Sequence, residues 1–136
     1  MTDCLFCSIL QKKIPCHKVY ENDSFIAFLD IHPVHLGHVL VVSKQHFETI
    51  EEMPLNQAKD LLSSIQEISK ALRQELGAEG VNVIANSGSV AGQVIFHAHM
   101  HIIPRFANDG LAPWSGKDVS EEDLVHNASQ LIKALE

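Results

Sequence analysis

The stretch Phe96-His97-Ala98-His99-Met100-His101-Ile102-Ile103 decides how this chain is interpreted. Its histidines alternate with Ala, Met and Ile, which is the two-residue period of a β-strand. On a strand, the three imidazoles would share one face, and their apolar neighbours would pack on a core on the other. Same-face neighbours are about 6.5–7 Å apart, so one metal ion could not easily bind all three at ligand distances of about 2 Å. We therefore expect the three histidines to have separate roles.

The segment before this strand favours chemistry on a phosphate group. Residues 86–93, Asn-Ser-Gly-Ser-Val-Ala-Gly-Gln, contain two glycines and several short polar side chains. Such loops can turn backbone N–H groups towards an anion, although this one is neither a Walker loop nor a GxGxxG motif. A neutral imidazole is a nucleophile and general base near pH 7, because its ordinary pKa is about 6.5. Together they indicate a phosphate held beside a histidine.

The remaining patterns predict an α+β fold. Strands are expected over residues 19–20, 24–30, 39–42, 81–85 and 93–103, the last one ending before Pro104. Apolar residues at steps of three and four predict a helix that begins at Pro54 and ends before Gly77. Ser120 and Asp123 form a weak capping box for a C-terminal helix. Because strands and helices do not alternate regularly, we expect an antiparallel sheet with a central helix packed on it.

Composition limits the classes of protein that fit. The chain has 136 residues, enough for one domain, and a net charge of −7. A protein this acidic has no broad basic face for nucleic acid or an anionic membrane. No apolar run approaches the roughly 20 residues of a membrane-spanning helix, and the N-terminal residues lack the pattern of a secretory signal. Three cysteines, an odd number, favour reduced thiols and a cytoplasmic location over a disulfide framework.

Residues 97–103 resemble the signature of the histidine triad (HIT) family, His-x-His-x-His followed by apolar residues. The preceding Gly92-Gln93, the following residues 104–106 and the upstream stretches 28–31 and 37–41 also resemble that family. The similarity covers about residues 4–106, leaving 107–136 as a C-terminal tail and helix. It implies a single HIT-like domain over residues 1–136 that acts as a homodimer on nucleotide conjugates of AMP or GMP.

The resemblance also implies a role for particular residues. His99 would be the nucleophile that forms a covalent nucleotidyl-histidine, with the backbone carbonyl of His97 accepting a hydrogen bond from its ring. The phosphate or leaving group would contact His101, His38, Gln93 and Asn86. Asp30 would accept hydrogen bonds from the ribose, and Phe28 and Ile31 would line a slot for the base.

One position departs from the family pattern. The phosphoramidase branch commonly carries Ser after the Gln, where this chain has Val94. A valine cannot relay a proton to an amine leaving group, so efficient cleavage of P–N bonds is not expected. Hydrolysis of dinucleoside polyphosphates is the alternative activity, because a phosphate leaving group needs less protonation.

Cys4-x-x-Cys7 has the spacing of half a zinc site. The resemblance to bacterial-type HIT proteins supplies the other two ligands, a downstream histidine and the first histidine of the triad, which are His46 and His97 here. Four protein ligands form a closed, structural zinc site. We expect this zinc ion to fix the N-terminal segment and the backbone beside His99.

Two other classes of protein are alternatives to an enzyme. One is a nucleotide-binding adaptor that acts through a partner protein, and the other is a metal sensor or carrier that uses the histidine face. Cys16 and His32 are expected in loops or on the surface. Trp114 is interpreted equally well as a subunit contact or as part of the core.

Overall fold

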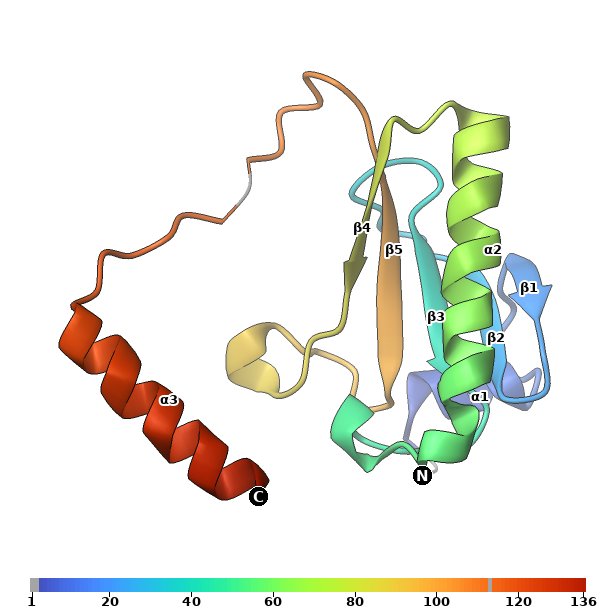
Figure 1. Cartoon of the computed structure of the whole chain (residues 1–136). Helices are drawn as coiled ribbons and strands as arrows, with labels where there is room; N and C mark the ends of the chain where they lie inside the picture. The colour runs from blue at the N-terminus through green and yellow to red at the C-terminus, as the bar shows by residue number, and fades with distance from the viewer. Residues whose placement is uncertain (1–2, 113) are drawn as a thin grey trace.

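The structure, a computed structural model, describes residues 3–112 and 114–136 (Figure 1). Its five strands form one antiparallel sheet in the order β1-β2-β3-β5-β4. The predicted α+β fold is confirmed. The strands are β1 (Lys18–Glu21), β2 (Phe25–Leu29), β3 (Val39–Ser43), β4 (Gly80–Ile84) and β5 (His99–Arg105), and the α-helices are α1 (Leu5–Leu10), α2 (Ala58–Leu76) and α3 (Glu121–Leu135).

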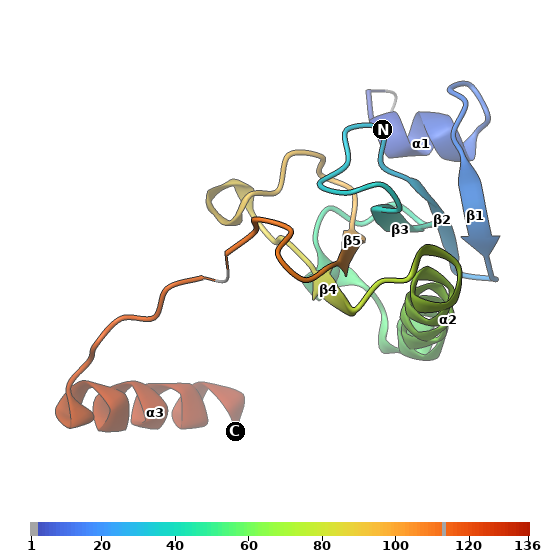
Figure 2. The ribbon, with the colours of Figure 1, turned by 90° about the horizontal axis from the view of Figure 1, so that it is seen from above.

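The centre of the sheet is covered on both faces, which is why β3 is a continuous apolar run. Val39 and Val41 point to one face and pack with the Ile68 side of α2. Leu40 and Val42 point to the other face and pack with α1. Seen from above, α1 and α2 lie on opposite sides of the sheet (Figure 2).

Helix α2 carries the apolar stripe that its sequence predicts. It ends as expected at Gly77, whose φ of 68° is the left-handed conformation that glycine adopts without a Cβ clash. Its start differs from the prediction, because Pro54 precedes a short 3-10 helix (Leu55–Gln57) and the α-helix begins only at Ala58. None of the described helices is both long and apolar enough to cross a bilayer.

Strand β5 begins later than predicted and ends later. Residues 93–98 are not strand, because the Ala98 amide donates to the carbonyl of Phe47 and the chain turns there. His97 therefore precedes the strand, and the expected start of the strand at residue 93 is wrong. The His97 ring still lies on the α1 side, packed against Phe6 at a centroid distance of 5.8 Å. The strand also continues through Pro104 to Arg105. Pairing with β3 stops at Ile102, so Pro104 lies beyond that neighbour, where its missing N–H costs less.

The two terminal helices are used very differently. Helix α1 was not predicted, and its first turn is organised by the thiol of Cys4, which accepts a hydrogen bond from the Cys7 amide. Helix α3 begins at Ser120, whose hydroxyl caps the Asp123 amide as predicted. It lies apart from the sheet in Figures 1 and 2, and all of its residues are exposed. Its apolar side chains thus contribute nothing to the core of a single chain.

Candidate active site and metal centre

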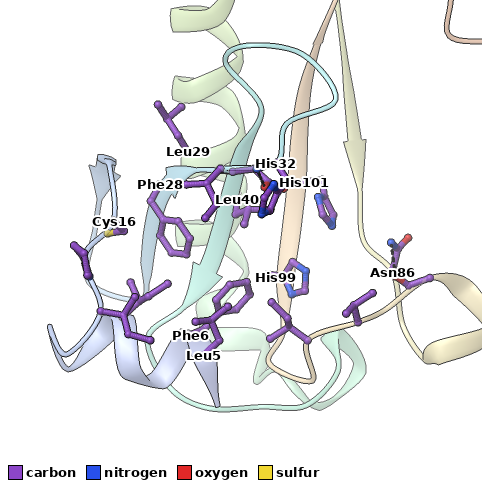
Figure 3. Close-up of a pocket in the computed structure, with 18 residues that line it drawn as sticks. Leu5, Phe6, Cys16, Phe28, Leu29, His32, Leu40, Asn86, His99 and His101 are labelled. Atoms are coloured by element: carbon purple, nitrogen blue, oxygen red, sulfur yellow. Dashed lines mark hydrogen bonds between the residues drawn. The ribbon is translucent and has the colours of Figure 1, made fainter. Parts of the chain in front are cut away.

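The histidines of β5 face a cavity of about 560 Å³ on the α1 side of the sheet (Figure 3). The register of β3 with β5 explains this, since His101 lies opposite Leu40 and His99 opposite Val42, the residues that point towards α1. Both imidazoles line the cavity, which is large enough for a nucleotide-sized ligand. Phe28 and Ile31 also contribute apolar side chains to its lining.

His99 has one ring nitrogen fixed and the other available. Its Nδ1 lies 2.6 Å from the carbonyl oxygen of His97, so Nδ1 carries the proton and donates it. The lone pair is then on Nε2. Burial lowers the pKa of His99, which keeps the ring neutral at pH 7. The ring of Phe6 packs edge-on against it at a centroid distance of 5.0 Å. A neutral, oriented imidazole of this kind is suited to nucleophilic attack.

A chain of hydrogen bonds sets the protonation of the other two histidines. The Val34 amide donates to Nδ1 of His38 over 3.1 Å, so neutral His38 carries its proton on Nε2. His38 Nε2 therefore donates to His101 Nδ1 over 2.9 Å. By the same reasoning, neutral His101 carries its proton on Nε2, where it can donate to a ligand. Burial and the neighbouring His99 and His38 lower the pKa of His101 to about 4.

Asp30 lies beside this chain at the wall of the cavity. One carboxylate oxygen accepts the His32 amide at 2.8 Å, and the other is 3.7 Å from His38 Nε2. Asp30, His38 and His101 are near enough to one another for a metal ion. However, a proton on His38 Nε2 excludes metal binding at that atom, and the Val34 amide holds it there. This geometry opposes a metal carrier that uses the histidine face.

Cys4, Cys7, His46 and His97 form a second cluster, in which the ligand atoms lie within 4.8 Å of one another. The sulfur to nitrogen distances from Cys4 to His97 and from Cys7 to His46 and His97 are 3.3–3.6 Å, and the two Nδ1 atoms are 3.1 Å apart. A tetrahedral zinc ion with bonds of about 2.3 Å to sulfur and 2.0–2.1 Å to nitrogen needs edges of about 3.5 Å. The Nε2–H of His97 donates to the Ser43 carbonyl over 2.7 Å, which leaves Nδ1 free as a ligand. The donor set therefore fits zinc.

His97 joins the two sites through one residue. Its ring, fully buried, belongs to the metal cluster, and its carbonyl oxygen holds the ring of His99. His97 and His99 therefore have the separate roles expected of them, and the peptide unit of His97 connects the metal cluster to the His99 ring.

Of the predicted phosphate contacts Asn86 and Gln93, one lines the cavity and the other does not. Asn86 lines the cavity. The Gln93 side chain is buried and fully committed, since its oxygen accepts the Gly88 amide and its nitrogen donates to the carbonyls of Glu48 and Ile95. Gln93 therefore shapes the loop rather than lining the cavity. His38 is also buried behind His101 and reaches the cavity only through that ring.

Part of the cavity wall comes from residues that the sequence did not single out. Leu5, Phe6 and Ile9 of α1 line it, as do Cys16 and His32, which lie in loops as expected. The three α1 residues recur at helical spacing directly after Cys4, and this is the signal that could have identified them.

The depressed pKa of His101 predicts how stability depends on pH. In the unfolded chain a histidine takes up a proton near pH 6.5, whereas folded His101 does so only near pH 4. Acidification from pH 7 to 5 therefore favours unfolding, by about 2 kcal/mol from this residue alone. Urea denaturation at both pH values measures this effect. Between pH 7 and 5, the unfolding free energy of His101→Gln should fall by about 2 kcal/mol less than that of the wild type. Equal drops in the two proteins would contradict the assignment.

Comparison with known proteins agrees with this geometry. The model of the HIT domain family matches residues 11–108. Adenylylsulfatase HINT3 from Arabidopsis thaliana is 38% identical over 98% of this chain and 68% of its own length. Adenosine 5'-monophosphoramidase hnt1 from Schizosaccharomyces pombe is 37% identical over 89% of this chain and 90% of its own.

Solved structures show the same fold. The structure of a member of the HIT family of proteins from Bacillus subtilis has 41% identity and a TM-score of 0.88, covering 96% of each chain. A Zn-bound histidine triad family protein from Mycobacterium smegmatis has 32% identity and a TM-score of 0.77, covering 99% of each chain.

Proposed function

Because this chain belongs to the HIT domain family, we propose that it hydrolyses conjugates of a purine nucleoside 5'-phosphate through a covalent intermediate on His99. The observation that carries the proposal is the His99 ring itself. Its Nδ1–H is held by the His97 carbonyl, its Nε2 is unprotonated, and it lines a cavity of nucleotide size. Similarity to an adenylylsulfatase and an adenosine monophosphoramidase supports a nucleotide substrate.

The shape of the cavity suggests how the substrate binds. Phe28 and Ile31 provide an apolar slot for the base. The carboxylate of Asp30 accepts hydrogen bonds from the ribose hydroxyls, and the Nε2–H of His101 donates a hydrogen bond to an oxygen of the α-phosphate. This places phosphorus in front of His99 Nε2. Hydrogen bonds to the phosphate oxygens stabilise the charge that develops during displacement.

The reaction then has two displacements. The Nε2 lone pair of His99 forms a bond to phosphorus as the bond to the leaving group breaks. Water next attacks phosphorus, the P–N bond breaks, and its electron pair returns to Nε2 while the water proton passes to solvent. The product is the nucleoside monophosphate. Dividing one difficult step into two easier ones is the advantage of a covalent intermediate.

Rapid quenching and intact-mass measurement test this proposal. When the protein is mixed with an excess of adenosine 5'-phosphosulfate and quenched in the steady state, we expect a species heavier by one adenylyl group, located at His99 by peptide mapping. An adaptor that binds nucleotide without catalysis would give neither the heavier species nor turnover.

Asp30 offers a test of substrate orientation. Wild-type protein is expected to prefer a ribonucleotide substrate to its 2'-deoxy analogue by about tenfold or more in kcat/KM, since a hydrogen bond to a charged group contributes about 1.5–3 kcal/mol. In Asp30→Ala this preference should fall to near one. Comparing two substrates on each protein separates the ribose contact from any general loss of activity. A preference that survives the substitution would place the ribose elsewhere.

We further propose that Cys4, Cys7, His46 and His97 hold a structural zinc ion. The tetrahedral edge lengths and the orientation of His97 support this, as does similarity to a Zn-bound family member. When bound, zinc supplies a cross-link between α1 and the segment that leads into β5, with no catalytic role. A cytoplasmic homodimer also belongs to the proposal. The free cysteines fit the cytoplasm, and the exposed apolar side chains of α3 offer a surface for a second copy.

A further inference from the structure

The turn between β2 and β3 carries the amide that decides how two active-site histidines are protonated. The N–H of Val34 donates to Nδ1 of His38, whose Nε2–H donates to Nδ1 of His101. The two rings could bond equally well with both protons reversed, because each neutral imidazole has one donor and one acceptor nitrogen. In the reversed chain, His101 would present a lone pair to the phosphate instead of a proton. The Val34 amide opposes this arrangement, since it requires a lone pair on His38 Nδ1.

The position of the Val34 amide is therefore critical. The nearby carboxylate of Asp30 lies 3.7 Å from His38 Nε2, which is beyond hydrogen-bonding distance. It favours the same proton through its charge alone. The bond from Val34 to His38 is 3.1 Å long. A displacement of the turn by about half an ångström would break this bond, because contacts longer than about 3.5 Å are no longer hydrogen bonds.

His35 holds the turn in place. From residue 31 to residue 36, every residue is exposed except His35. Its ring packs edge-on against Phe106 at a centroid distance of 5.6 Å, and its Nε2 lies 3.5 Å from Oδ2 of Asp109. Phe106 and Asp109 come just after β5, which leaves the sheet beside this turn (Figure 1). His35 thus ties the turn to the strand that carries the histidines of the cavity.

Asp109 is a firmly fixed partner for this contact. Its carboxylate accepts hydrogen bonds from Nε and Nη2 of Arg105 at 2.7 and 2.9 Å, and from the amides of Phe106 and Leu111 at 3.1 Å. Arg105 and these amides hold the pKa of Asp109 well below its usual range, so the carboxylate is ionised. The Nε2 atom of His35 is buried and has no hydrogen-bond partner among the described residues. A proton on this atom is attracted to the carboxylate, whereas a lone pair would be repelled.

We propose that His35 and Asp109 are positioning residues for the reaction at His99. Their contact holds the Val34 amide in place, and that amide fixes the proton that His101 presents to the substrate. This inference rests on the function proposed above, because it assigns two further residues to the same reaction. Neither of these described side chains lines the cavity, so both act through other groups. Without their contact, the reversed chain would be populated, and His101 would repel the phosphate oxygen that it otherwise binds.

Two substitutions of His35 test the proposal on the full-length, zinc-loaded protein. His35→Leu keeps an apolar group against Phe106 but removes the N–H that faces Asp109, whereas His35→Gln retains a side-chain N–H. We expect kcat/KM for adenosine 5'-phosphosulfate to fall by about tenfold in His35→Leu and by less than about threefold in His35→Gln, since the affected hydrogen bond is to a charged group. His17→Leu is the matched control, because His17 is exposed and outside the cavity lining. It should keep the wild-type value within about twofold.

Nitrogen-15 NMR of histidine-labelled protein measures the protonation of the rings directly. Couplings within each ring distinguish a proton on Nδ1 from a proton on Nε2. In the wild type at pH 7, we expect His38 and His101 both to carry the proton on Nε2. In His35→Leu, both should show an additional population with the proton on Nδ1, while thermal unfolding stays cooperative. A merely structural role for His35 would lower Tm and leave the two protons where they are.

The possible results separate this inference from the proposed function. A proton on Nδ1 of His101 in the wild type, or unchanged protonation in His35→Leu, would overturn the proposal at any level of activity. Equal losses of kcat/KM in His35→Leu and His35→Gln would also overturn it, because the effect would not depend on the N–H that faces Asp109. If the protonation responds as expected but the wild type forms no adduct on His99, the control of the two rings by the turn is supported and the nucleotidyl-histidine mechanism fails.

Discussion

His99→Ala is expected to lower kcat/KM for adenosine 5'-phosphosulfate by at least about 10⁴-fold, because removing a nucleophile leaves only binding and electrostatic stabilisation. The methyl group of alanine cannot form a bond to phosphorus, and no other ring in the cavity has the same fixed geometry. His101 presents a proton rather than a lone pair. Steady-state assays and the intact-mass measurement should therefore show that His99→Ala loses both turnover and the adduct.

The control for this variant is His126→Ala, a substitution in α3, where all residues are exposed. It should retain wild-type turnover. Thermal unfolding of His99→Ala should still be cooperative, and the protein should still bind AMP, which shows that the cavity is intact. Residual turnover above about 1% of wild type, with the same adduct mass, would mean that another residue is the nucleophile.

Loss of the metal is expected to have the second largest effect. Cys7→Ser should reduce zinc from one ion per chain to a small fraction, because one of the four ligands is lost. Removing a structural metal leaves its ligands clustered without a partner, and we expect unfolding free energy to fall by about 3 kcal/mol or more. For a domain of this size that corresponds to a fall in Tm of roughly 10 °C.

Elemental analysis and thermal unfolding measure this effect directly. Cys16→Ser is the matched control, because Cys16 is a free cysteine outside the metal cluster. It should retain zinc and the wild-type Tm. If wild-type protein contains no zinc after purification without chelators and after zinc is supplied, the proposed centre is wrong.

The sequence predicted the fold well where one pattern has one structural cause. The stripe of α2 and its end at Gly77 follow from helical periodicity and glycine's left-handed conformation. The apolar run of β3 requires cover on both faces, and it has it. Strand β5 shows the limit, because the alternation from His97 to His101 indicates a strand although His97 serves a different site.

The candidate site was predictable only in part, for a similar reason. Alternation identified His99 and His101 as same-face neighbours, and the structure brings both to the cavity. Sequence gives no sign that Gln93 is consumed by backbone partners, since that depends on how the loop folds back on Glu48. Helix α1 is short, and Cys7 within it has low helical propensity. Its six residues are organised by contacts with distant segments, which local patterns do not report.

The two faces of the sheet have different roles in the molecule. The buried residues that pack with α2 belong only to the core, whereas several of those that pack with α1 belong to the core and also line the cavity. Substitutions among the buried residues that face α2 can therefore change thermal stability without altering the cavity. Directed evolution of selectivity, in turn, should concentrate its libraries on the short N-terminal helix and on positions 86–95, and leave the long helix alone.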